Sequence, residues 1–118
     1  MTEPSIVFEK RELTPFAEPV STSKLKEGSV YFAVNFVDDE MRIPIVETLV
    51  FIGRDGTGVL RFQDVESFRQ GVRFETATDD DHAIFFQCPE DHANHIFEYE
   101  HALEALMRCS LRRRELGR

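Results

Sequence analysis

The segment at residues 29–37, SVYFAVNFV, most constrains the fold because its side chains alternate with the two-residue period of a β-strand. Its even-numbered residues share one apolar face: Val30, Phe32, Val34 and Phe36. After an acidic turn at residues 38–40, MRIPIVETLVFIG at residues 41–53 is expected to continue as one long strand or two short ones. Pro44 cannot donate a ladder hydrogen bond, so it predicts an edge, a bulge or a break.

Turn signals extend this strand pattern toward the C-terminus. Asp55-Gly56 predicts a hairpin, because both central turn residues tolerate positive φ, and VLRFQ then returns as a strand. Asp64 can cap a short helix at about residues 64–71, with Gly71 as a left-handed terminator. VRFET and HAIFFQ are expected to form further strands around the polar turn at residues 79–81.

The last element expected is an amphipathic helix, EHALEALMRCSLRRREL, at residues 100–116. A helical wheel predicts a core-facing side made of Ala102, Leu103, Leu106, Met107 and Ser110. It places His101, Glu104, Arg108 and Arg112 on the opposite side. IFEY at residues 96–99 fits either a last strand or the helix start. The chain is therefore expected to be α+β: an antiparallel meander of about five to six strands with the helix across one face.

Length and composition indicate one globular domain over residues 1–118. The chain is 42% hydrophobic and 31% charged, which is typical of a soluble protein with a real core. Residues 1–28 are expected to form an irregular arm with a short strand near Ile6–Glu9, pinned to the body by Phe16 and Val20. The absence of a secretory signal or a long apolar span predicts a cytoplasmic protein without a membrane partner, whose cysteines stay free thiols.

Charge limits the class of partner. The chain carries a net charge of −8, which argues against a nucleic-acid partner because phosphate binding needs clustered cations. Residues 108–118 alone hold five arginines and Glu115, a net of +4, so residues 1–107 carry −12. The arginines either complement the helix dipole or offer a handle to an acidic partner. The acidic body favours a basic protein partner.

The most chemically suggestive stretch is QCPEDHANH, at residues 87–95. Cys88, His92 and His95 are the side-chain types that zinc prefers, so these three are the candidate metal ligands. A fourth ligand is missing, because His82 lies about 20 Å from Cys88 along an extended strand. A thiol enzyme would use Cys88 as nucleophile and a neighbouring histidine as base. The simplest interpretation is a solvated turn in which Pro89 ends a strand.

These patterns favour a small acidic protein-interaction or regulatory module that is not catalytic and carries no cofactor. The alternative is a small metal-dependent or thiol enzyme centred on Cys88, His92 and His95. A pocket for a small molecule between the sheet and the arm is a weaker third hypothesis. Residues 41–53 are apolar on both strand faces, more than one helix can cover. We therefore expect the arm or a second subunit over one face, and the latter predicts a homodimer.

Overall fold

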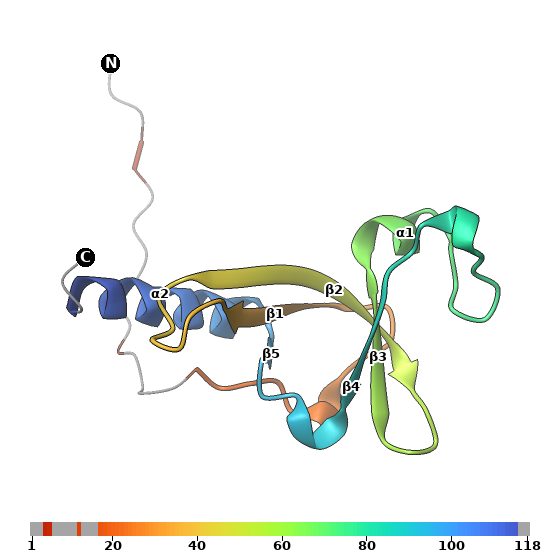
Figure 1. Ribbon diagram of the computed structural model, residues 1–118, viewed down its shortest axis with the longest axis horizontal. Helices are drawn as coiled ribbons and strands as arrows, with labels where there is room; N and C mark the ends of the chain where they lie inside the picture. Colours follow the sequence, from red (N-terminus) through yellow and green to blue (C-terminus); the bar gives the residue numbers. More distant parts are fainter. Residues whose placement is uncertain (1–3, 6–11, 13–16, 116–118) are drawn as a thin grey trace.

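The computed structural model describes residues 4–5, 12 and 17–115, and this part of the chain is an α+β fold (Figure 1). Its one sheet is antiparallel, with the strand order β4-β3-β2-β1-β5. The strands are β1 (Val30–Phe36), β2 (Pro44–Arg54), β3 (Val59–Asp64), β4 (Phe85–Pro89) and β5 (Ile96–Phe97). The helices are α1 (Val65–Arg69) and α2 (Tyr99–Glu115), with 3-10 turns η1 (Thr22–Lys24), η2 (Asp79–Asp81) and η3 (Glu90–His92).

The predicted α+β class, with a C-terminal helix packed on the sheet and one short helix, is confirmed. The strand predicted at Ile6–Glu9, and Phe16, lie outside the described residues.

Strand β2 is one long strand that joins the two halves of the sheet. Its first part pairs with β1, from Pro44 opposite Phe36 onward, and its second part pairs with β3. The register with β3 shifts between Phe51 and Gly53, and Gly53 has a φ of 129°. Pro44 is tolerated because it begins the strand, where a missing amide proton costs least. The bulge lets the second half of β2 turn steeply away, as Figure 1 shows.

The main core fills the concave side of the sheet. Leu60 on β3, Cys88 on β4 and Ile96 on β5 belong to one buried cluster, although β4 and β5 are the outer strands of the sheet order. The sheet therefore curls until both of its edges face one core. The buried members of this cluster are Tyr31, Ala33, Leu49, Phe51, Leu60, Phe62, Cys88, Ala93 and Ile96.

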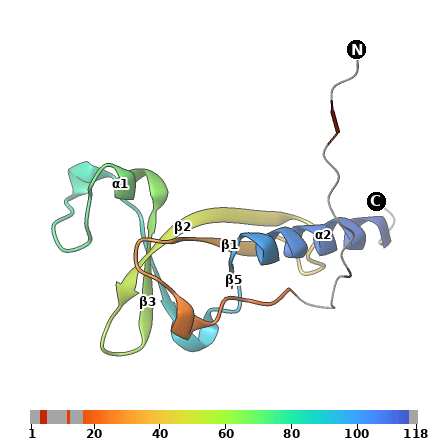
Figure 2. The same cartoon turned by 180° about the vertical axis from the view of Figure 1, so that it is seen from behind.

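The segment at residues 17–29 crosses the open side of the curled sheet (Figure 2). The amide of Val20 donates to the Ile96 carbonyl at 2.9 Å, and the amide of Gly28 donates to the Phe51 carbonyl at 2.8 Å. The side chains of Val20 and Leu25 pack against the core cluster. The prediction that Val20 pins the arm to the body is thus confirmed. The arm covers the side of β2 that faces the core cluster.

Helix α2 packs on the other sheet face, over β1 and β5. Ala102 and Ala105 are buried with Val34 and Phe97 in a second cluster, and the half-buried Leu106 packs against it. Leu103 and Met107, which the helical wheel places toward the core, are exposed instead. The predicted buried side is therefore right for Ala102 and Leu106 and wrong for Leu103, Met107 and Ser110. Arg108, predicted on the outward side, is buried. Phe32 and Phe36 already fill this sheet face, so the helix approaches through alanines.

None of the described helices is long and apolar enough to cross a membrane.

The β2–β3 hairpin lies where it was predicted, but its turn type differs. Gly58, with a φ of 82°, takes the left-handed position in place of Gly56. The Asp55 carboxylate accepts hydrogen bonds from the amides of Thr57 and Val59 at 2.8 and 3.1 Å. These bonds shape the loop so that positive φ falls on its last residue, as in a three-residue hairpin loop.

The strand predicted at VRFET, residues 72–76, does not form. The amide of Val72 donates back to the Ser67 carbonyl, and the Arg73 guanidinium stacks on Phe68 at 4.2 Å from the ring centroid. These local contacts use groups that a strand would need for pairing. The strand predicted at HAIFFQ begins only at Phe85 and runs to Pro89. The predicted cap and terminator of α1, Asp64 and Gly71, are confirmed.

Candidate interaction surface

Cys88 is the last residue but one of β4 and has its side chain in the core, where only 8% of the residue is exposed. Its sulfur lies 3.4 Å from the Pro89 carbonyl and 3.5 Å from the His92 carbonyl, so the thiol donates to the backbone of η3. Burial, helped by the negative charge of Asp91, raises the pKa of the Cys88 thiol. A raised pKa reduces the thiolate that both zinc binding and nucleophilic attack require.

The two histidines of the same stretch do not join this thiol. His92 is exposed on η3 and contacts Cys88 through its backbone carbonyl. His95 is half-buried just before β5, where its carbonyl accepts a hydrogen bond from the Val34 amide. Among the described residues, no three His, Cys, Asp or Glu side chains gather to hold a metal ion. The geometry therefore lends no support to a metal site at Cys88, His92 and His95, which stays a prediction from sequence.

Four large apolar side chains of α2 are exposed, whereas Leu106 packs against the second cluster and the exposed Tyr99 ring also contacts Phe32 edge-on. The four exposed side chains form a row with a spacing of four residues, which we call the outer stripe: Tyr99, Leu103, Met107 and Leu111. Their exposed fractions are 67%, 45%, 40% and 42%, respectively. Single exposed apolar residues are common, but a row along one helix face is typical of a surface that binds another protein.

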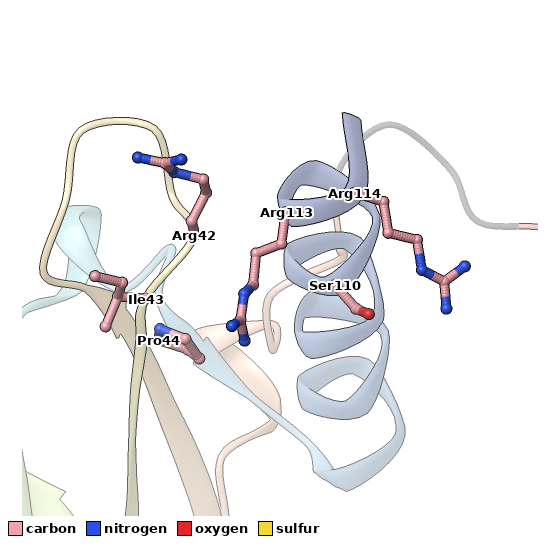
Figure 3. Close-up of a pocket in the computed structure, with 6 residues that line it drawn as sticks. All are labelled: Arg42, Ile43, Pro44, Ser110, Arg113 and Arg114. Carbon is pink, nitrogen blue, oxygen red and sulfur yellow. The ribbon is translucent and has the colours of Figure 1, made fainter. Parts of the chain in front are cut away.

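Helix α2 covers β1 and β5 and leaves part of the same sheet face open over β2. Val46 on β2 is opposite Val34 in the register, and it is 44% exposed although Val34 is buried under the helix. At the same end, a cavity of about 620 Å³ separates the β1–β2 loop from the last turns of α2 (Figure 3). Its lining residues are Arg42, Ile43, Pro44, Ser110, Arg113 and Arg114. We call this cavity the hairpin groove.

Arginine gives the hairpin groove its positive charge. Arg113 reaches from α2 toward Pro44, whereas Arg114 points to the other side of the helix (Figure 3). Both are exposed, and neither forms an ion pair with a residue in the described part of the chain. Arg42 is turned into its own loop, where its guanidinium pairs with Asp38 and Glu40. The available positive charge therefore belongs to the end of α2.

Two hydrogen bonds fasten this end of α2 to the β1–β2 loop. The Arg112 guanidinium donates to the Met41 carbonyl at 2.9 Å and lies over the Phe36 ring, 5.3 Å from its centroid. The Cys109 thiol donates to the Arg42 carbonyl at 3.1 Å. The outer stripe is consequently presented by a helix that is held at both ends, by β5 and by the loop.

Comparisons with protein-family models, with curated proteins and with solved structures find no match for this chain. The surface itself is therefore the only guide to function in the described part of the chain. Sequence reasoning missed the outer stripe because it assigned Leu103 and Met107 to the core. The signal that would have identified it is the second row on the same helix, made of the small residues Ala102, Ala105 and Cys109.

Proposed function

We propose that the protein is a small interaction module that acts by binding another protein chain through the outer stripe and the adjoining hairpin groove, without catalysis. The observation that carries this proposal is the orientation of α2. It buries alanines against the sheet and leaves Leu103, Met107 and Leu111 in contact with water. Such an arrangement costs the isolated chain free energy, which a partner would recover by covering the stripe.

The energetics of the surface support binding. Leu103, Met107 and Leu111 expose 40–45% of their surface, so complete burial of one of them contributes about that share of 1.5–3 kcal/mol, or roughly 0.6–1.3 kcal/mol. Because α2 is already fastened through Arg112 and Cys109, little conformational entropy remains to be lost when a partner docks. The exposed arginines at the helix end add charge that orients the partner.

We also propose a cellular location and a preferred partner charge. Both cysteines, Cys88 and Cys109, are buried free thiols, which fits a reducing compartment and thus a cytoplasmic protein. The body of the chain is acidic, which favours a basic surface on a partner that contacts the sheet side. The enzyme alternative gains no specific observation from the geometry at Cys88.

Photo-crosslinking in the native host tests the proposal. A photoreactive amino acid placed at Met107 should capture a defined protein chain, whereas the same group at exposed Glu66 on α1 should not. The captured chain is then purified and its direct affinity measured. We expect Leu103→Ser to weaken that affinity at least tenfold, because a buried apolar contact is lost. Identical adducts from both positions, or an affinity unchanged by Leu103→Ser, would overturn the proposal.

A further inference from the structure

We propose that the chain covering the outer stripe is a second copy of this protein, with the two α2 helices packed antiparallel about a two-fold axis at Met107. The inference rests on the proposed function, because it names the partner of the same surface. Its support is the self-complementarity of α2 in shape and in charge.

Three of the four side chains of the outer stripe, Leu103, Met107 and Leu111, are symmetric about Met107, whereas Tyr99 would lie opposite Glu115. Helix α2 spans residues 99–115, so Met107 is its midpoint. Antiparallel pairing about this point brings Leu103 of one copy against Leu111 of the other and Met107 against its own counterpart. A two-fold interface requires this kind of pattern, in which one patch is complementary to itself.

Charge along α2 is complementary under the same operation. The first turns contain Glu100 and Glu104, and the last turns contain Arg112, Arg113 and Arg114. The antiparallel register places Glu100 of one copy beside exposed Arg114 of the other, on the side where the outer stripe lies. A parallel pair would instead align acids with acids and arginines with arginines. Antiparallel packing also sets the two helix dipoles in opposite directions.

The geometry of the outer stripe determines how tightly the dimer is expected to associate. Side chains spaced by four residues form ridges that pack with a crossing angle of about 50° between helices. A helix of this length measures only about 26 Å, so one helix pair supplies less than the roughly 1,200–2,000 Å² of a standard interface. Val46, on the part of the sheet that α2 leaves open, is a further exposed apolar residue. We therefore expect a reversible dimer with a dissociation constant in the micromolar range.

Sedimentation of the full chain over a wide concentration range tests the dimer. The mass should rise from monomer to dimer as concentration increases. Met107→Arg places two like charges at the axis, and we expect it to weaken dimerisation at least a hundredfold. Val37→Arg is the matched control, since Val37 is 65% exposed and lies outside α2. It should leave the dissociation constant within threefold, with both variants melting close to the parent protein.

A charge exchange tests the antiparallel register. Arg114→Glu and Glu100→Arg should each weaken self-association at least tenfold, because each creates two like-charge pairs. An equimolar mixture of the two variants should form heterodimers, and the double variant should regain the parent affinity. A hetero-partner on the outer stripe would produce none of this rescue.

The outcomes separate the two proposals. A monomeric mass at every concentration, or dimers without rescue by the charge exchange, would overturn the antiparallel homodimer. If the crosslinker at Met107 then captures a different chain whose affinity depends on Leu103, the interaction module stands with another partner. If it captures no chain, both proposals fail.

Discussion

At the scale of single residues, Asp64 joins two elements that are distant in sequence. Its carboxylate accepts hydrogen bonds from the Ser67 amide in α1 and from the Ile84 amide just before β4, both at 2.9 Å. Burial opposes ionisation of Asp64, but these hydrogen bonds and that from the Ser67 hydroxyl outweigh it, so the pKa of the carboxyl lies below its ordinary value. The cap on α1 was readable from sequence, whereas the bond to Ile84 depends on how β4 returns.

Replacing Asp64 by Asn should destabilise the protein at neutral pH. Asn retains one accepting oxygen, but its amide nitrogen cannot accept a hydrogen bond, so either the Ser67 amide or the Ile84 amide loses its acceptor. We expect a loss of about 1–2 kcal/mol in the free energy of unfolding, as for a donor left without a partner. A carboxylate with a lowered pKa stabilises the fold above its ordinary pKa of 3.8, and this contribution disappears as pH falls through the folded pKa.

The measurement is urea unfolding of the parent protein and Asp64→Asn, from neutral pH down to below the folded pKa of Asp64. The difference between them should shrink as the solution becomes acidic. Asp80→Asn, at an exposed position in η2, should follow the parent protein throughout. A difference that is the same at both ends of the range would contradict the role given to the carboxylate.

At the scale of elements, α2 shows that hydrophobicity alone does not choose the buried face of a helix. Its helical character and its charge order follow from local sequence, whereas the sequence left IFEY open between a strand and the helix start, and α2 begins within it at Tyr99. The packed face depends on what the sheet offers, and there Phe32, Phe36 and Phe97 occupy most of the volume. Alanines let the helix approach, and the larger Leu103 and Met107 are left outside.

The helical wheel predicts which face of α2 tolerates substitution. We expect the effects on stability to be the opposite of that prediction. Ala105→Leu adds volume to a filled contact and should cost about 1–3 kcal/mol of stability. Leu103→Ala removes an exposed side chain with little change in helix propensity and should cost less than about 0.5 kcal/mol. Urea unfolding at low protein concentration, where self-association is weak, measures both. A larger loss from Leu103→Ala than from Ala105→Leu would show that the helix packs the other way.

At the scale of the whole molecule, the arm at residues 17–29 completes the core. The curled sheet brings β4 and β5 to one cluster but leaves a side open, and Val20 and Leu25 close it. At the far end, the Arg54 guanidinium donates to the Thr22 carbonyl at 2.7 Å and pairs with Glu90, so arm, β2 and η3 meet. The arm is thus a structural part of the fold.

Leu25→Ser should weaken the whole fold, because its apolar contact with the core is replaced by a polar group. We expect a loss of about 1–3 kcal/mol in the free energy of unfolding. Lys24→Ser, at the exposed neighbouring position, is the control and should change stability by less than about 0.5 kcal/mol. Chemical unfolding followed by circular dichroism compares the two, and equal midpoints would contradict a closing role for the arm.

Local sequence determined the strands at β1 and β2, the hairpin after β2, the capped helix α1 and the presence of α2. Each follows from side-chain period or turn chemistry within a few residues, and such signals act before any distant contact forms. The α+β class follows from the order of these elements.

Only the tertiary structure decided which surfaces are buried and where a site lies. Cys88, His92 and His95 are close in sequence, but the direction of β4 places the Cys88 thiol inside and η3 carries His92 outside. The same holds for α2, whose exposed stripe depends on the volume left by phenylalanines on distant strands. Side-chain direction and free volume are properties of elements packed together, so no short stretch of sequence contains them.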